Sequence, residues 1–237
     1  MRRRTGIGAA LGTAVALVIA ACGGSSGGGA ADNGVAAKSA DQIVAQATRA
    51  IDDVHSVRVS GNVGSGHGQG AIHLDLHLVE GTGATGSMSE NGLAFKLITV
   101  NDNAYVNGSP DFWKQFGGSA AVQLLQGRWL RAPADHGPFA SFASLTDLHK
   151  LVSGLLTGHG ALTKGATSTI DGQKVIALTD KTNQGTLYVA TTGPPYPIQI
   201  SGGGTSGGGE LDFSAFDHPV TVKAPASSID ITKLKKK

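Results

Sequence analysis

Three side chains of metal-binding type alternate along one short segment of the sequence. His73, Asp75 and His77 would share one face of an extended strand, with about 7 Å between neighbours. Two imidazoles and a carboxylate are ligand types that bind zinc. The residues between and beside them are all apolar: Ile72, Leu74, Leu76 and Leu78. Since the sequence places no other histidine or cysteine to complete a site, we interpret the three as the polar outer face of a strand and expect no metal.

Hydrolytic chemistry would require a nucleophile, a base and an acid that orients the base. Serines, aspartates and the histidines His136, His149 and His159 are present, but no Gly-x-Ser-x-Gly sequence stands between a strand and a helix, where a nucleophile elbow must lie. The glycine-rich run Gly64–Gly70 lies between predicted strands, and the run Gly202–Gly209 lacks the Gly-Lys-Ser/Thr ending of a phosphate-binding loop. We interpret both runs as turns and expect neither catalysis nor a cofactor.

The only cysteine, Cys22, follows a basic and then apolar N-terminus. Three arginines precede an apolar run over residues 7–21, which is shorter than the roughly 20 residues of a membrane-spanning helix. The sequence Ile19-Ala20-Ala21-Cys22 resembles the lipobox of bacterial lipoproteins. The resemblance implies that residues 1–21 are a signal peptide cut before Cys22, that the thiol receives a diacylglyceryl group, and that the new amine is acylated, for instance with palmitate. The alternative is an ordinary signal peptide with an incidental cysteine.

Such an anchor has a physical consequence for location. Each buried acyl methylene contributes about 0.8 kcal/mol, and a single chain binds a membrane only marginally, whereas two or three chains hold firmly. We therefore expect the mature protein on the extracytoplasmic face of the cell membrane, which it does not cross. Residues 22–38, rich in glycine, serine and alanine, are predicted to form a flexible tether.

Composition excludes several classes of protein. The whole chain of 237 residues has a formal charge of +2 from 19 basic and 17 acidic residues; removing the three arginines of residues 1–21 leaves 16 basic against 17 acidic, a charge of −1. This balance is not that of a nucleic-acid-binding protein. With one cysteine no disulfide can form within the chain. Only 15% of residues are charged and 36 are glycine, which favours a β-rich single domain with frequent turns.

The first half of the domain is predicted to be a helix followed by strands. Ser39 and Gln42 form a capping-box pattern before a helix over residues 40–54, whose apolar residues recur on one face. Strands are predicted at 57–63, 72–78, 93–97 and 104–106, with Asn101-Asp102-Asn103 as a hairpin turn. The glycines Gly81, Gly83 and Gly86 are interpreted as turn residues.

The second half is predicted to return from helices to strands. Residues 111–126 have helical spacing with a break at Gly117-Gly118. Ser144 with Asp147 is expected to cap a second helix, whose apolar face runs from Leu145 to Leu156. Asp171-Gly172 predicts a hairpin turn, and strands are expected at 167–170, 174–178, 186–190, 196–200 and 210–213. The order predicts an α+β fold, an antiparallel sheet with one face covered by helices. The basic tail, residues 231–237, is interpreted as solvated, with contact to anionic headgroups as the alternative.

Three sequence elements carry a resemblance to a known family. They are the first helix leading into His55-Ser56-Val57-Arg58-Val59-Ser60-Gly61, the segment Asn103-Ala104-Tyr105-Val106 followed by Phe112-Trp113, and Gly185-Thr186-Leu187-Tyr188-Val189 with Gly193-Pro194-Pro195-Tyr196-Pro197. They resemble the LolA-like lipoproteins, and most closely the LppX/LprA/LprF/LprG group. The resemblance covers roughly residues 40–229, and we place the lipid-binding domain that it implies at residues 39–230. It implies a curved half-barrel whose concave apolar face is closed by helices and whose cavity binds acyl chains of lipids or glycolipids.

Residues expected to line such a cavity come from two strands and one helix. They are Leu74, Leu76, Leu78, Phe95, Leu97, Leu148, Leu151 and Leu155. Four aromatic residues form either a lip at the cavity mouth or ordinary packing of the middle helices: Phe112, Trp113, Phe116 and Trp129.

The function that these observations favour is a non-enzymatic, membrane-anchored lipoprotein that binds acyl chains and carries them within the cell envelope. Its expected partners are a lipid or glycolipid ligand, the membrane itself through the anchor, and an envelope transporter; a monomer without nucleic acid is expected. The alternative is an envelope lipoprotein whose core is filled and which acts as a scaffold or protein-interaction module.

Overall fold

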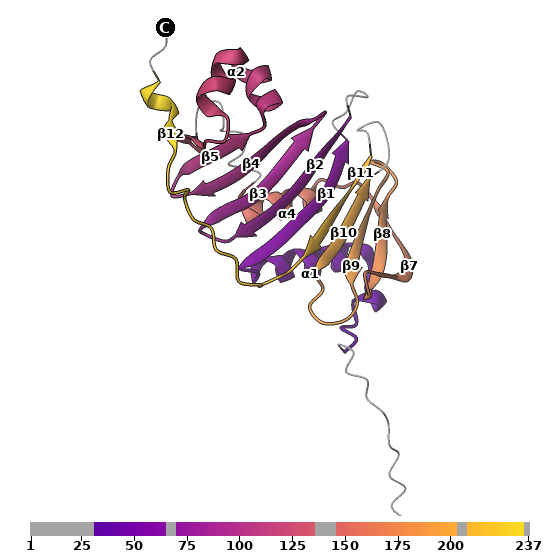
Figure 1. The fold of residues 1–237 in the computed structure, drawn as a ribbon. Coiled ribbons are helices and arrows are strands. Elements are labelled where there is room, and N and C mark those ends of the chain that lie inside the picture. The colour runs from indigo at the N-terminus through magenta and orange to yellow at the C-terminus, as the bar shows by residue number, and fades with distance from the viewer. Residues whose placement is uncertain (1–30, 65–69, 136–145, 203–207, 235–237) are drawn as a thin grey trace, which may run out of the picture. The chain divides into compact units, whose positions relative to one another are not determined.

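The computed structural model describes residues 31–64, 70–135, 146–202 and 208–234 (Figure 1). The chain divides into two units, Met1–Ala30 and Ala31–Lys237, and all described residues belong to the second. This unit contains its own hydrophobic cores, as a domain that folds independently does. Cys22, the predicted signal peptide and Ser144 lie outside the described residues.

One sheet of twelve strands forms the body of the second unit, and it is not closed (Figure 1). The spatial order is β12-β6-β5-β4-β3-β2-β1-β11-β10-β9-β8-β7. All neighbours are antiparallel except β12 and β6, which are parallel. The strands are β1 Ser56–Gly64, β2 Ala71–Val79, β3 Gly83–Glu90, β4 Leu93–Val100, β5 Asn103–Gly108, β6 Leu130–Pro133, β7 Leu162–Ile170, β8 Gln173–Asp180, β9 Gly185–Ala190, β10 Pro197–Gly202, β11 Gly209–Ser214 and β12 Ile229–Asp230.

Three α-helices accompany the sheet in the described residues: α1 Ala40–Asp52, α2 Pro110–Leu125 and α4 Leu148–Thr157. The predicted capping box is confirmed, because Ser39 Oγ accepts from the Gln42 amide and the Gln42 side chain accepts from the Ser39 amide. Two 3-10 turns, η1 Val35–Ala37 and η3 Ile231–Lys233, flank the domain. The predicted α+β class with a helix-covered sheet is confirmed.

Strand register shows that all three helices cover the same face of the sheet. Leu76 of β2 lies opposite Gly86 of β3, which lies opposite Leu97 of β4, and the row continues through Val106 to Leu130. Side chains of directly opposite residues point to the same side. Leu76 packs in the cluster that contains α1 and α4, while Leu97 packs in the cluster that contains α2. The helix-covered face therefore carries two adjacent cores.

Part of the opposite face packs against the chain after β11. This segment runs along the sheet towards β12 (Figure 1), and Val220 and Val222 pack there with Val100, Tyr105 and Ile98. Register places this set on the side that faces away from the helices, since Tyr105 lies opposite Ile98. β4 and β5 thus carry apolar side chains on both faces, and Leu93–Val100 is a nearly continuous hydrophobic run.

The structure corrects two predicted turns and a helix cap. Gly83 and Gly86 belong to β3, which was not predicted; a Cβ at Gly86 would collide with the Asp75 carbonyl oxygen, so the glycine permits close approach of β2. β6 and β12 were also missed, because strands of four and two residues are too short to show a clear alternation of apolar and polar residues. Asp147 by itself is the N-cap of α4, where it accepts from the Lys150 amide at 3.0 Å.

The folded domain also begins earlier than predicted. Residues 31–38 were expected to belong to the tether, but Val35 is completely buried and Asn33 Nδ2 donates to the carbonyl oxygens of Ala190 and Gly193. At the other end, Ile231 packs in the α2 core, although residues 231–237 were predicted as a solvated tail. Both segments are held by partners far away in the sequence, which local composition does not reveal.

Candidate functional site

An apolar pocket of about 640 Å³ lies between α2, the sheet and the C-terminal segment. Its volume is within the range of about 300–1,000 Å³ that is typical of small-molecule sites. The strands contribute Ile72, Met88, Ser89, Glu90, Phe95 and Leu130; α2 contributes Phe112, Trp113, Phe116, Gly117, Ala121 and Leu125; the C-terminal segment contributes Ile231 and Leu234. The surface of this pocket is predominantly carbon, so it suits an apolar ligand.

Helix α2 is positioned over the sheet by a well-defined start. Ser109 is its N-cap and accepts from the Phe112 amide at 3.2 Å, and Pro110 occupies the first turn. Gly108, the last residue of β5, allows the helix to come close, because a Cβ there would collide with the Phe112 ring. The predicted break is confirmed at Gly118, whose φ of 67° interrupts the helix.

An aromatic cluster forms the α2 wall of the pocket. The ring centroid of Phe112 lies 4.9 Å from that of Phe95, 5.0 Å from that of Trp113 and 4.6 Å from that of Phe116. Phe112 and Trp113 are buried, while Phe116 is 68% exposed. Both sequence interpretations therefore apply to this cluster: its inner rings pack the helix on the sheet and Phe116 stands at the mouth. Trp129 is elsewhere, packed on the opposite face of the sheet.

Few polar groups reach this pocket. Ser89 and Glu90 line it from the end of β3. The buried indole Nε1 of Trp113 has no hydrogen-bond partner among the described residues. The arrangement can therefore enclose hydrocarbon, but it offers no paired nucleophile and base in its lining.

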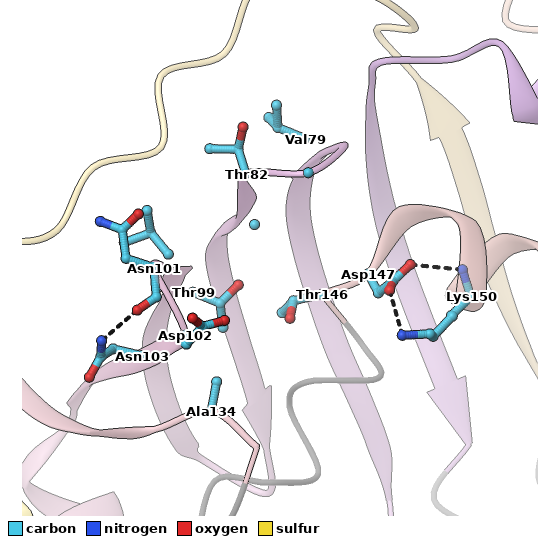
Figure 2. Close-up of a pocket in the computed structure, with 13 residues that line it drawn as sticks. Val79, Thr82, Thr99, Asn101, Asp102, Asn103, Ala134, Thr146, Asp147 and Lys150 are labelled. Carbon is cyan, nitrogen blue, oxygen red and sulfur yellow. Dashed lines mark hydrogen bonds and ion pairs between the residues drawn. The ribbon is translucent and has the colours of Figure 1, made fainter.

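A second hollow, of about 660 Å³, lies at the opposite ends of β2, β3 and β4 and is polar (Figure 2). Asp147 pairs there with Lys150 Nζ at 2.9 Å and also accepts from the Lys150 amide. These hydrogen bonds, led by that of the Lys150 side chain, lower the pKa of the Asp147 carboxyl group. Asn103 Nδ2 donates to the Asn101 carbonyl oxygen at 2.6 Å. The Asn103 hydrogen bond stabilises the turn between β4 and β5, and the Asp147–Lys150 interactions stabilise the start of α4. Because the first pocket matches the apolar chemistry of an acyl chain and this one does not, we take the first as the candidate site.

The predicted cavity residues do not surround one space. Four of them are at most 2% exposed and fill the cores: Leu76, Leu78, Leu97 and Leu148. Leu74 and Leu151 pack partly buried against the α1/α4 core. Leu155 is 36% exposed and borders a separate cavity of about 150 Å³ with Leu162 and Ile200. Of the predicted set, only Phe95 lines the apolar pocket.

Sequence reasoning missed most of the pocket wall. The α2 residues Ala121 and Leu125 and the C-terminal residues Ile231 and Leu234 were not among the predicted cavity residues. The signal that pointed to this place was the aromatic group Phe112, Trp113 and Phe116, for which a lip at the cavity mouth was one of two interpretations.

The alternating histidine segment faces away from the helices. Asp75 forms a two-point ion pair with Arg58, from Nε to Oδ1 and from Nη2 to Oδ2, each at 2.8 Å. The hydrogen bond from Arg58 lowers the pKa of Asp75. The carboxylate is thus already engaged by a cation, and no group of three or more metal-ligating side chains occurs within the described residues. In those same residues, no helix has the length and apolar character needed to span a membrane.

Comparison with known proteins gives a match at the level of the fold. No protein-family model matches the sequence, and no curated protein does so. Among solved structures, LprF from Mycobacterium bovis matches with a TM-score of 0.54 and 16% identity, over 78% of this chain and 96% of LprF. The lipoprotein LppX from Mycobacterium tuberculosis matches with a TM-score of 0.51 and 20% identity, over 78% of this chain and all of LppX. At the level of the fold, the resemblance inferred from the sequence is confirmed: the chain shares the fold of LprF and LppX.

Proposed function

We propose that this protein is a membrane-anchored lipoprotein that binds the acyl chains of a lipid or glycolipid in the apolar pocket beneath α2 and carries them within the cell envelope. The observation that carries the proposal is the pocket itself: about 640 Å³ lined by aromatic and aliphatic side chains. Every methylene enclosed there contributes about 0.8 kcal/mol, so binding needs no directional chemistry. The shared fold with LprF and LppX is consistent with this proposal.

The anchor is the second part of the proposal. Cys22 follows two alanines and an apolar run, and it is the only cysteine of the chain. Acylated there, the protein is held at the extracytoplasmic face of the cell membrane, close to a source of lipid. In this scheme it acts as a monomer, and an envelope transporter supplies or removes the lipid.

A specific observation favours the alternative of a scaffold. The helix-covered face is closely packed around Leu76, Leu78 and Leu97, which are at most 2% exposed. A core of this kind has no room for a ligand. If the α2 pocket is also filled by a neighbouring protein in the envelope, the domain acts as an interaction module and not as a carrier.

Binding of an acyl probe to delipidated protein separates the two functions. We expect saturable uptake of a fluorescent fatty acid by the chain that starts at residue 22 with Cys22→Ala, which lacks the anchor. Native mass spectrometry of the same protein before delipidation should show a lipid adduct. Absence of both uptake and adduct would contradict the carrier and leave the scaffold.

A further inference from the structure

We infer that the polar hollow between the β4–β5 turn and the start of α4 is a second binding site, which takes a neutral polyhydroxylated group such as a sugar or an inositol. Its volume of about 660 Å³ is within the range of small-molecule sites. Among the described residues it shares no lining residue with the apolar pocket, so the inference goes beyond acyl binding. The unpaired polar groups of the hollow, its balance of charge and the rigidity of its walls support it.

Polar side chains from two distant parts of the chain lie on opposite sides of the hollow (Figure 2). Asn101 and Asp102 form the tip of the β4–β5 turn, and Asp147 and Lys150 lie at the start of α4. The φ angles of Asn101 and Asp102 are 51° and 57°, a left-handed conformation that asparagine and aspartate adopt more readily than other residues with side chains. The turn thereby presents two polar side chains to the hollow, where glycine would present none.

Several of these polar groups have hydrogen-bonding capacity left for a ligand. Within the described residues, neither the Asp102 carboxylate nor the side-chain amide of Asn101 has a hydrogen-bond or ion-pair partner. Lys150 Nζ pairs with Asp147 at 2.9 Å, and an ammonium group has further N–H donors beyond the one that such a pair uses. The hollow therefore offers a free carboxylate acceptor on the turn and free donors on both sides.

These groups favour hydroxyls over ionic ligands. A hydroxyl both donates and accepts hydrogen bonds, so neighbouring hydroxyls of one ring can donate to Asp102 and accept from Lys150. Asp147 and Lys150 neutralise each other, which leaves Asp102 as the uncompensated charge among the described lining residues and disfavours an anion such as phosphate. A metal ion would require more ligands than one free carboxylate, and no group of three metal-ligating side chains occurs in the described part of the chain.

Hydrogen bonds hold the walls of the hollow in place without using the free side-chain groups. The Ala134 amide donates to the Asp102 carbonyl oxygen at 2.9 Å, and Asn103 Nδ2 donates to the Asn101 carbonyl oxygen at 2.6 Å. Val100 and Ala134 add apolar surface against which the C–H groups of a ring can pack. Because the turn is fixed before binding, little conformational entropy is lost when a ligand is bound.

Titration with neutral polyols, followed in the amide NMR spectrum of isotope-labelled protein, tests this site. The protein is the Cys22→Ala chain from residue 22, and the probes are glucose, mannose, galactose and myo-inositol. We expect at least one of them to shift the amide resonances of residues 101–103 and 147–150 saturably, without shifting that of Ala121 in the apolar pocket. No saturable shift by any of the four, or a stronger effect of inorganic phosphate or ethanolamine at the same amides, would overturn the inference.

A matched pair of variants tests the role of the free carboxylate. Asp102→Asn keeps a residue that tolerates the turn but replaces a charged acceptor with a weaker neutral one, so the polyol should bind about tenfold more weakly. Asp171→Asn is the control, because Asp171 is also exposed in a hairpin turn with a positive φ, 48° against 57° for Asp102. Unchanged affinity in a folded Asp102→Asn protein, or equal losses in both variants, would contradict the site.

The polyhydroxylated group has two sources, the headgroup of a lipid held in the apolar pocket or a free sugar. Phe95 and Thr99 line the two sites and are about 13 Å apart along β4, within the reach of one acyl chain, which spans about half of a 30 Å hydrocarbon core. For the polyol that binds, tighter binding of its dodecyl derivative, lost when Ala121→Trp fills the apolar pocket, would identify the headgroup. Equal binding of both forms, unaffected by Ala121→Trp, would identify the free sugar.

Uptake of a fluorescent fatty acid keeps this inference separate from the proposed function. Asp102 does not line the apolar pocket, so Asp102→Asn should take up the fatty acid normally. Uptake without any polyol binding would refute the polar site alone. Polyol binding without any uptake would refute the carrier alone.

Discussion

Filling the apolar pocket from its α2 wall is the most direct test of the proposed function. Ala121 is half-buried and lines the pocket, whereas its neighbour Ala120 is exposed on the same helix. Ala121→Trp places an indole into the space that an acyl chain would occupy. Ala120→Trp is the matched control, because it has the same change of mass and helix propensity but points elsewhere.

The expected loss of affinity follows from the contact area. An enclosed tryptophan buries about 150–250 Å². If about 100 Å² of this replaces area that the acyl chain would cover, the chain loses about 2.5 kcal/mol at about 25 cal/mol per Å². This corresponds to roughly 70-fold weaker binding. The protein should remain folded, because the pocket of about 640 Å³ has room for the ring.

Titration with a fluorescent fatty acid gives the affinity, and circular dichroism with thermal unfolding checks the fold. We expect a large loss for Ala121→Trp and affinity close to wild type for Ala120→Trp. Wild-type affinity in a folded Ala121→Trp protein would refute the assignment of this pocket as the ligand site. An equal loss in both variants would show that α2 responds to the bulk of the residue and not to filling of the pocket.

Four further predictions concern the anchor, the core, pH and metal. Cys22→Ala should leave the protein unprocessed or release it into the soluble fraction; a processed variant that still fractionates with membranes would contradict the anchor. Leu76→Trp should lower the free energy of unfolding in urea by about 1–3 kcal/mol, because it overpacks a filled core in which Leu76 is 2% exposed. Acyl uptake should stay intact, since Leu76 does not line the pocket. Blocked uptake at unchanged stability would instead place the ligand at the centre of the sheet. Asp180 accepts from the backbone amides of Gly160, Thr182 and Asn183. These hydrogen bonds, led by that of Gly160, lower the pKa of Asp180 from 3.8 to about 2. The contribution of Asp180 to the stability of the fold is therefore complete above about pH 4 and is lost as the pH falls towards 2. Asp180→Asn should therefore be less stable at neutral pH and show a smaller fall in melting temperature between pH 4 and 2; an unchanged acid profile would count against this. Elemental analysis of untagged protein should find no stoichiometric zinc, and a one-to-one metal content that disappears in His73→Ala would show the expectation to be wrong.

Local structure was readable from the sequence where short-range chemistry decides it. The Ser39/Gln42 capping box, the break of α2 at Gly118 and the hairpin at Asp171-Gly172 all depend on residues within a few positions of one another. The strict alternation of Ile72–Leu78 likewise fixed which side of β2 faces the helices. These features predicted the α+β class without any knowledge of long-range contacts.

The order of the strands in the sheet could not be predicted from local sequence patterns. β1 pairs with β11, and β6 pairs with β12 nearly a hundred residues later, so the order of the strands depends on contacts between distant segments. The burial of Val35 and the packing of Ile231 against the α2 core have the same origin, although composition placed both residues in tails. The glycines of β3 were interpreted as turn residues. In the structure they lie within a strand, where they allow the backbone of the neighbouring strand to come close.

The sequence by itself determined which residues face the helices, and only the tertiary structure decided which of them have room beside them. Periodicity assigns Leu76 and Phe95 to the apolar sides of their strands, but it cannot say whether a helix fills the volume opposite each. α1 and α4 close the space over Leu76, while α2 and the C-terminal turn leave about 640 Å³ beside Phe95. A pocket is the difference between the volume that the elements enclose and the volume that side chains occupy, and that difference exists only once the elements are packed.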